Sequence, residues 1–177
     1  YSVTYDWNAH TATGTATGAK GESLSGLNLA GTTHTNAGDY PVDPWTFTDV
    51  TGNYKSTSGT VHDVIAKANA TIVVTGYHVT YDGNPHTAAG SAVGVQGESL
   101  NALLNLSGTT HTNAGIYLVD SWSFAGDSNY NLASGTVVDQ IDKANATISV
   151  TPYTVTYDGN AHTATGTATG VNSEALT

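Results

Sequence analysis

The residues of this chain that could do chemistry are histidines and carboxylates that recur along the sequence. They are His10, His86 and His162, His34 and His111, Asp6, Asp82 and Asp158, Glu22 and Glu98, and Asp43 and Asp120. Recurrent imidazoles could bind a metal, although a histidine beside threonines in strand-rich sequence is more often a surface or satisfied polar residue. Calcium needs about six converging oxygen ligands, and no DxDxDG-type loop is present to deliver them. We therefore expect no resident metal and no cofactor.

Hydroxyl residues beside histidines could supply a nucleophile and its base, as at Thr33-His34 and His10-Thr11. Such a nucleophile also needs an orienting acid. No GxSxG elbow frames these residues, and hydroxyls are so abundant that adjacency is expected by chance. Nothing positions a pair of carboxylates for glycosidase chemistry either. We expect a protein that is not an enzyme.

Two lysines recur at corresponding places, although the chain has only four lysines and arginines together. Lys67 and Lys143 could be solvated side chains that discourage edge pairing of strands. Alternatively, each could form a lysine–asparagine isopeptide bond, as in some Ig-like pilus modules. That bond needs a buried lysine, a facing asparagine and a nearby carboxylic acid. Asn53 and Asn129 recur as the candidate partners.

The sequence repeats with a period of about 76 residues. Residues 1–76 form a first copy and residues 77–152 a second, which match at most positions, and residues 153–177 begin a third. The third copy is too short to bury a core of its own. Because the chain starts abruptly in a strand-like segment, we expect it to be a window from the middle of a longer protein.

Composition limits the function further. The net charge is −10, so binding to nucleic acid or to an anionic membrane is not expected. No apolar run approaches the ~20 residues of a membrane-spanning helix. The chain has no cysteine, methionine or arginine, which excludes a disulfide scaffold and thiol chemistry. These absences suit a protein that persists outside the cell, and we expect an extracellular or cell-surface location.

Alternating apolar residues predict strands and hence an all-β fold. Tyr77, Val79 and Tyr81 would share one face of a strand, and Gly76 just before them marks a bulge or an edge kink. Trp45 and Trp122, each followed two residues later by phenylalanine, are predicted core residues. Strand signals recur every eight to twelve residues, which is typical of a β-sandwich.

A turn followed by tyrosine is the most diagnostic local feature. The sequence TNAGDY ends at Tyr40 and TNAGIY ends at Tyr117. This pattern resembles the tyrosine corner of Ig-like sandwiches, in which the tyrosine hydroxyl bonds back to a nearby backbone group. An ordinary hairpin turn followed by a core tyrosine is the alternative.

Three motifs together resemble the MBG and YDG-type repeats of bacterial surface proteins: the YDGxxHTATGTATG opening, the SGTTHTNAG centre and the KANATI-VT junction. The resemblance covers the whole chain. It implies tandem Ig-like β-sandwich modules of about 76 residues, arranged end to end, as in large adhesins and exoproteins. The implied domains are residues 1–68, a first module without its leading strand segment, residues 69–144, a second module, and residues 145–177, the start of a third.

Two functions fit this description. The first is a structural module of a bacterial extracellular stalk or fibre, whose partners are neighbouring repeats and which could self-assemble. Because the junctions have no flexible linker, the modules should form a rod. The second is an adhesive module that binds a carbohydrate or a host protein. Trp7 replaces the glycine of YDG in the first copy, and it is the best single candidate for a ligand contact.

Overall fold

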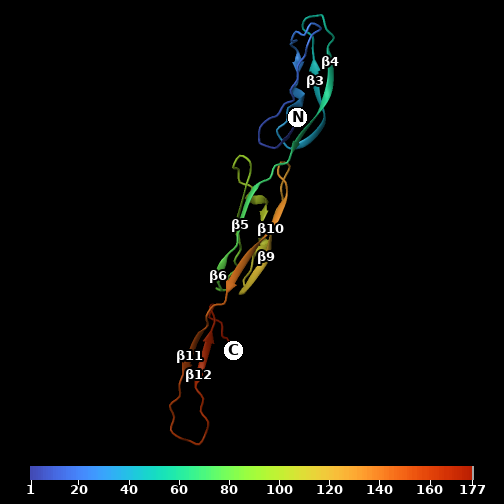
Figure 1. The fold of residues 1–177 in the computed structure, drawn as a ribbon. Coiled ribbons are helices and arrows are strands. Elements are labelled where there is room, and N and C mark those ends of the chain that lie inside the picture. The colour runs from blue at the N-terminus through green and yellow to red at the C-terminus, as the bar shows by residue number, and fades with distance from the viewer. Residues whose placement is uncertain (177) are drawn as a thin grey trace. The chain divides into compact units, whose positions relative to one another are not determined.

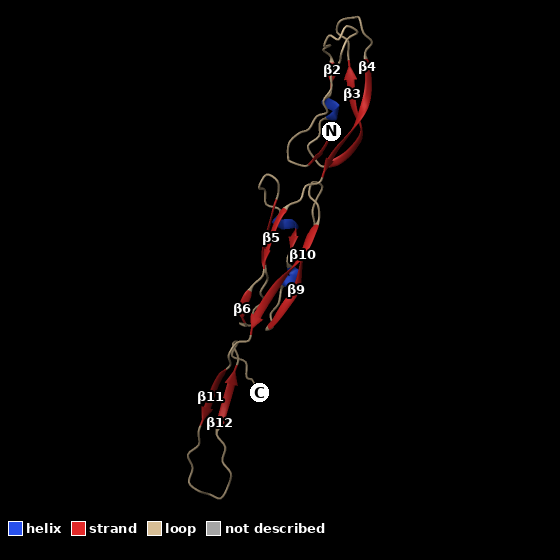
Figure 2. Ribbon diagram, in the orientation of Figure 1, coloured by secondary structure: helices blue, strands red, loops and turns tan. Residues whose placement is uncertain are grey.

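The protein is described here by a computed structural model that covers residues 1–176. The fold is all-β, as predicted, and its curled sheets are consistent with a β-sandwich (Figures 1 and 2). The strands of the first copy and its junction are β1 (Ser2–Thr4), β2 (Leu27–Asn28), β3 (Gly38–Phe47), β4 (Thr57–Ala66) and β5 (Thr71–Thr75). The later strands are β6 (His78–Thr80), β7 (Ala89–Val93), β8 (Leu104–Asn105), β9 (Gly115–Phe124), β10 (Ala133–Asp142), β11 (Thr147–Thr151) and β12 (Thr165–Thr169). Three short 3-10 helices are η1 (Ala30–Thr32), η2 (Asn101–Leu103) and η3 (Ser107–Thr109).

Two four-stranded sheets have the same strand order, β1-β4-β3-β2 and β6-β10-β9-β8. In the first sheet β3 and β4 form a long antiparallel hairpin, with a register shift between Tyr40 and Asp43. Strand β1 runs parallel to β4 and β6 runs parallel to β10. The first strand of each sheet therefore lies beside its last strand in the chain.

Two smaller sheets each have two strands, β5 with β7 and β11 with β12. Strands β5 and β6 are almost consecutive, yet they belong to different sheets. The extended segment is interrupted between them at Gly76. A Cβ atom built at this position would lie 2.0 Å from the carbonyl oxygen of Val138, so glycine is needed for the close approach of the two backbones.

The buried apolar core is small and follows the predicted alternation. Its members are Tyr5, Phe47, Ile65, Ala68, Ala88, Ala92, Phe124, Tyr130 and Ile141. Trp45 and Trp122 are only half-buried, in contrast to the core position predicted for them. Each indole lies across a hairpin from a glycine, and a Cβ at Gly59 or Gly135 would lie within 2.7 Å of the ring. The phenylalanines two residues further on supply the buried aromatic rings.

The chain divides into two compact units. The first contains Tyr1–Val73, Ser91–Leu104 and Phe124–Ala133, and the second contains Val74–Gly90, Asn105–Ser123 and Ser134–Thr177. The domain bounds expected from the repeats stay a prediction. In residues 1–176 no helix has the length and apolar character needed to cross a membrane.

Candidate functional site

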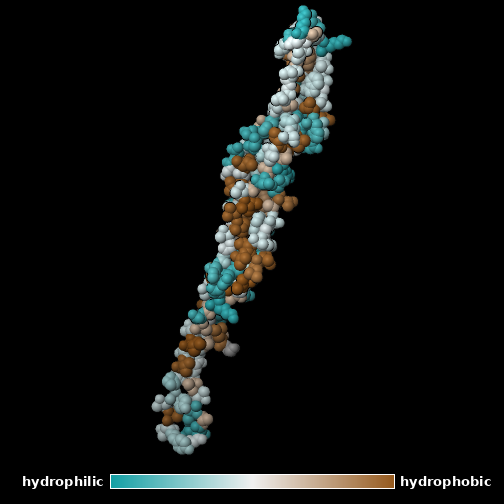
Figure 3. Space-filling view, in the orientation of Figure 1, coloured by the Kyte–Doolittle hydropathy of each residue, from teal (hydrophilic) through white to brown (hydrophobic). Residues whose placement is uncertain are grey.

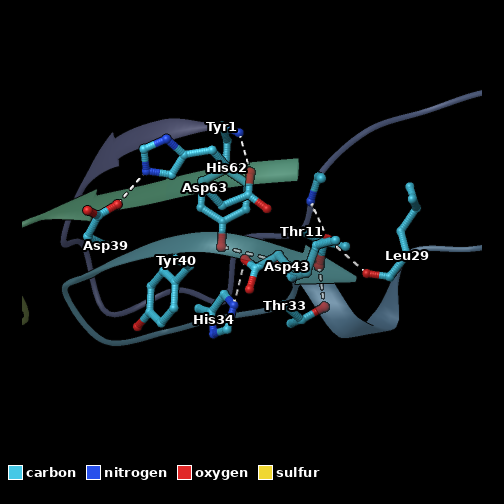
Figure 4. Close-up of polar contacts among 12 residues, drawn as sticks. Tyr1, Thr11, Leu29, Thr33, His34, Asp39, Tyr40, Asp43, His62 and Asp63 are labelled. Carbon is cyan, nitrogen blue, oxygen red and sulfur yellow. Dashed lines mark hydrogen bonds and ion pairs between the residues drawn. The ribbon is translucent and has the colours of Figure 1, made fainter. Parts of the chain in front are cut away.

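A histidine, an aspartate and a tyrosine form a cluster in the first unit (Figure 4). The imidazole Nε2 of His34 lies 2.8 Å from Oδ2 of Asp43 on β3. Its ring stacks on Tyr40 with 3.5 Å between ring centroids and 7° between planes. The Tyr40 hydroxyl donates to the carbonyl oxygen of Asn36 at 2.8 Å. The Tyr40 hydroxyl thus closes the turn, and the Tyr40 ring stacks against the imidazole of His34.

The second unit contains the same cluster. Nε2 of His111 lies 2.7 Å from Oδ2 of Asp120, and the imidazole stacks on Tyr117 at 3.5 Å. The Tyr117 hydroxyl donates to the carbonyl oxygen of Asn113 at 2.8 Å. This is the hydroxyl-to-backbone contact expected of a tyrosine corner, although the bond is exposed to solvent. The threonines beside these histidines bond to other threonines, since Oγ1 of Thr87 lies 2.8 Å from Oγ1 of Thr110.

A completely buried aspartate lies on β4 and another on β10, each next to the residue that precedes the parallel strand β1 or β6. Asp63 accepts a hydrogen bond from the amino group of Tyr1, and Asp139 accepts one from the backbone N–H of Tyr77 at 2.9 Å. The second oxygen of each carboxyl, Oδ2, has no hydrogen-bond partner. Burial raises the pKa of Asp139, and the neighbouring carboxyl of Asp120 raises it further.

Sequence reasoning missed these two aspartates, although a signal was present. Asp63 lies between Val61 and Ile65 at the alternate positions of β4, so it belongs to the inward face of the strand. A charged residue in such a pattern predicts a buried polar contact. Each aspartate therefore bonds to the chain at the start of the parallel strand beside it.

Three of the other histidines, His10, His86 and His162, close turns. Nε2 of His10, His86 and His162 lies 2.8–2.9 Å from Oδ1 of the aspartate four residues earlier. Hydrogen bonds from the side chain and the backbone of Asn8 lower the pKa of Asp6 to about 2. The backbone and the side chain of Asn84 do the same for Asp82, whose pKa is also about 2. These contacts stabilise the turn in which the YDG motif lies.

The second recurrent site is a turn whose glutamate accepts a hydrogen bond from the hydroxyl of a distant tyrosine. In the first unit, Glu98 folds back on its own turn, where its carbonyl oxygen accepts from Gly94 N–H at 2.9 Å and its Oε2 accepts from Gln96 N–H at 2.9 Å. Oε1 accepts the hydroxyl of Tyr130, and that hydroxyl accepts from Val95 N–H at 2.8 Å. Tyr130 is only 2% exposed. Burial, followed by the bond to Glu98, raises the pKa of Tyr130 to about 12.

The loop that carries Tyr130 is itself held by the junction segment. Ala68 donates its N–H to the carbonyl oxygen of Asn129 at 2.9 Å and accepts from Asn131 N–H at 2.8 Å. The rings of Tyr130 and Tyr5 form a T-shaped pair, with 5.6 Å between centroids and 86° between planes. In the first copy, Glu22 holds Tyr54 in the same way, and this bond raises the pKa of Tyr54.

The lysines and asparagines considered for a crosslink lie in other contacts. Lys67 is exposed, and its Nζ donates to the backbone carbonyl of Asp127. The Asn129 amide is engaged by Ala37 N–H and by Asn36 at 2.9 and 3.2 Å. Asn53 lies in an exposed turn, 3.5 Å from the carbonyl of Thr51. Lys143 is also exposed.

Trp7 has an unusual backbone. Its φ is 73°, in the left-handed region, where the second and third copies have Gly83 and Gly159 with φ of 80° and 78°. A non-glycine residue costs about 1–2 kcal/mol in that region. The indole is 53% exposed and touches the edge of Tyr5 at 6.0 Å between centroids. The first copy therefore keeps an exposed tryptophan at a strained position.

An apolar stripe lies on β9 and β10 of the second copy, where Figure 3 shows brown residues. Ile116, Leu118 and Val138 are 64%, 66% and 53% exposed. In the first copy, the positions of Ile116 and Val138 are taken by Asp39 and His62, whose side chains contact each other through Oδ1 and Nε2. The two copies thus share their framework and differ in surface chemistry.

Among residues 1–176, no group of three or more histidine, aspartate or glutamate side chains is arranged to hold a metal ion. Comparison of the chain with protein-family models, with curated proteins and with solved structures gives no match in any of the three.

Proposed function

We propose that this chain is a segment of a bacterial extracellular stalk or fibre that withstands tension, built from tandem Ig-like sandwich modules. The two sheets with the same strand order support this, as do the first strand that changes sheet at Gly76 and the tyrosine that closes the turn before β9. The recurrent clusters serve as architecture in this proposal. The extracellular location rests on the composition of the chain.

The observation that carries the proposal is the parallel pairing of β6 with β10. His78, Val79 and Thr80 pair with Gln140, Ile141 and Asp142. The backbone extends the ladder at both ends, where Gln140 N–H donates to the Tyr77 carbonyl and Tyr81 N–H donates to the Asp142 carbonyl, each at 2.8 Å. Force that enters before β6 and leaves after β10 therefore shears these bonds together instead of opening them one at a time.

The packed junction supports the same role. Tyr130 is buried between Glu98, Tyr5 and Ala68, all in the first unit, so the segment that follows β4 is held by side-chain and backbone contacts. A junction held in this way transmits tension with less slack than a solvated Gly/Ser linker.

Single-molecule force spectroscopy tests the proposal, and the absence of cysteine allows specific attachment. Handles at H78C and K143C load the β6–β10 ladder in shear. Handles at T80C and K143C load the same end of both strands and unzip the ladder. We expect a clearly higher unfolding force for the first pair, and equal forces would contradict the proposed role of the β6–β10 ladder in withstanding tension.

An adhesive function is the second candidate, because Trp7 is exposed on a strained backbone and the apolar stripe on β9 and β10 is exposed. Exposed tryptophan is suited to stacking on a sugar ring or on a protein surface. A glycan array probed with the wild-type chain and with Trp7→Gly tests it. Binding that is lost in the variant would favour adhesion over a purely structural role.

A further inference from the structure

The buried carboxyl of Asp139 on β10 has one oxygen atom that receives no hydrogen bond. Asp139 is 0% exposed, and its Oδ1 accepts from the backbone N–H of Tyr77 at 2.9 Å. Its Oδ2 has no hydrogen-bond partner. An ionised carboxyl that is buried without its full set of donors is very costly, so a group in this position is expected to bind a proton or a counter-ion.

A second carboxyl, that of Asp120 on β9, lies within hydrogen-bonding reach of Asp139. Two ionised carboxylates can only accept hydrogen bonds, so they would repel each other across this contact. The contact becomes a hydrogen bond when one of the two carboxyls carries a proton. Asp139 is the better carrier, because it is completely buried, whereas the side chain of Asp120 is 11% exposed and keeps some contact with water.

His111 connects this pair of carboxyls to the surface. Its Nε2 lies 2.7 Å from Oδ2 of Asp120, and its side chain is 24% exposed. One proton between the carboxyls gives every acceptor of the series a donor, because His111 and Asp139 both donate to Asp120. The N–H of Tyr77 then completes the series at Oδ1 of Asp139. The network runs from solvent to the core, so its proton can exchange with water.

The other titratable groups that face the two carboxyls already donate elsewhere. Tyr77 faces them from the start of β6 and Tyr117 faces them from β9. The Tyr77 hydroxyl donates to the carbonyl oxygen of Thr109 at 3.3 Å, and the Tyr117 hydroxyl donates to that of Asn113 at 2.8 Å. Of these two tyrosines and His111, only the imidazole can carry a positive charge. A proton is therefore the donor that best fits the unpartnered oxygen.

We propose that Asp139 and Asp120 share one proton well above the pH at which an exposed aspartate ionises, and that this proton holds the start of β6 against β10. When the pH rises far enough, the proton leaves to solvent through Asp120 and His111, and two adjacent carboxylates remain.

The raised pKa of Asp139, caused first by its burial and further by the Asp120 carboxyl, agrees with this assignment. Opening of β6 would return Asp139 to water, where it ionises in the ordinary range, so loss of the proton favours the open form. The opening breaks the bond from Gln140 N–H to the Tyr77 carbonyl, which is 2.8 Å long in the closed ladder. Only the consequence of this opening for tension rests on the proposed function.

Carbon-13 NMR of the full chain, labelled at the aspartate Cγ atoms, measures the proton directly. We expect Asp139 Cγ to titrate above the ordinary pKa of 3.8, and Asp120 Cγ to shift in the same step because the two groups are coupled. Asp120→Asn separates a shared proton from simple burial. Its amide can donate to Asp139, so the titration of Asp139 should fall toward 3.8 in this variant. A wild-type titration at or below 3.8, or one that Asp120→Asn leaves unchanged, would overturn the shared proton.

Hydrogen exchange of the Gln140 and Tyr81 amides, corrected for the intrinsic effect of pH, measures the hold on β6. Above the raised pKa of Asp139, the wild-type protection factors should fall by up to about tenfold per pH unit. Asp139→Asn is the matched variant, because its neutral amide mimics the protonated carboxyl, and its protection should stay constant. Wild-type protection that is constant from about pH 4 to about pH 8 would overturn the hold. Equal forces in the two pulling geometries would leave both measurements unchanged, so the two proposals fail separately.

Discussion

At the scale of single residues, a few buried polar side chains decide where the strands begin and where the loops attach. Asp139 fixes the start of β6 through the Tyr77 N–H, and Glu98 fixes the loop of Tyr130. Each contact joins residues more than thirty positions apart in the sequence. Removing Asp139 or the Tyr130 hydroxyl leaves the partner group without its hydrogen bond, and this is the costly way to lose one.

Tyr130→Phe should lower the free energy of unfolding by about 1.5–3 kcal/mol, because the hydrogen bond is to a charged carboxylate and the ring is buried. The measurement is urea denaturation followed by tryptophan fluorescence. Tyr117→Phe is the matched control, since its hydroxyl bond is exposed to solvent. We expect the control to cost less than about 1 kcal/mol. Equal losses of unfolding free energy in the two variants would contradict a stabilising hydrogen bond between Tyr130 and Glu98.

Asp139→Asn should change how stability depends on pH. The pKa of Asp139 is raised in the folded chain, so the protonated form is favoured by folding. The stability that this group contributes is present below the ordinary pKa of 3.8 and is lost as the pH rises through the raised value. The amide is neutral, so the melting temperature of the variant relative to wild type should increase from pH 3 to pH 7.

Asp142→Asn is the control for this titration. The Gln140 side chain and His78 lower the pKa of Asp142, so its charged form is favoured by folding. Its contribution is present above pH 3.8 and is lost as the pH falls through the lowered value. The relative melting temperature of this variant should therefore change in the opposite direction. A parallel course for the two variants would show that Asp139 is not buried as described.

At the scale of elements, the strands were more predictable than the contacts between them. The alternation of Tyr77, Val79 and Tyr81 predicted the half-buried face of β6 and its flanking residues, and Gly76 predicted the interruption before it. These signals are local, because period-two burial and glycine geometry act over a few residues. The Glu98–Tyr130 contact depends on how the chain returns after 32 residues, and no local pattern contains that information.

The tryptophan prediction shows the same limit on one element. Both Trp122 and Phe124 lie on β9 at alternate positions, so the sequence placed both in the core. The structure buries Phe124 fully and leaves Trp122 half-buried over Gly135. Alternation identifies the inward face of a strand, but it does not say how deeply each position on that face is covered.

Phe124→Ala should therefore cost more than Trp122→Ala. A buried phenylalanine leaves a cavity, and its loss costs about 3–5 kcal/mol. A half-buried indole should cost about half of that, because part of its surface already meets water. Chemical denaturation of both variants, followed by far-UV circular dichroism, measures the difference. A larger loss for Trp122→Ala would mean that the indole, and not the phenylalanine, closes the core.

At the scale of the whole molecule, the sequence repeats and one copy leads directly into the next. The junction sequence IAKANATI has no proline-rich or Gly/Ser linker. Within the first unit, the loop of Tyr130 is bonded to Ala68 of this junction on both sides. A stalk follows if every junction is packed in this way, because short packed junctions favour end-to-end stacking.

Small-angle X-ray scattering of a monodisperse sample tests this central claim most directly. Modules of about 30–40 Å stacked end to end should give a radius of gyration of about 25 Å or more and a distance distribution with a long tail. A compact globule of the same length has a radius of gyration of about 16 Å. We expect the extended profile. A near-spherical profile, with the first and second copies packed side by side, would contradict it.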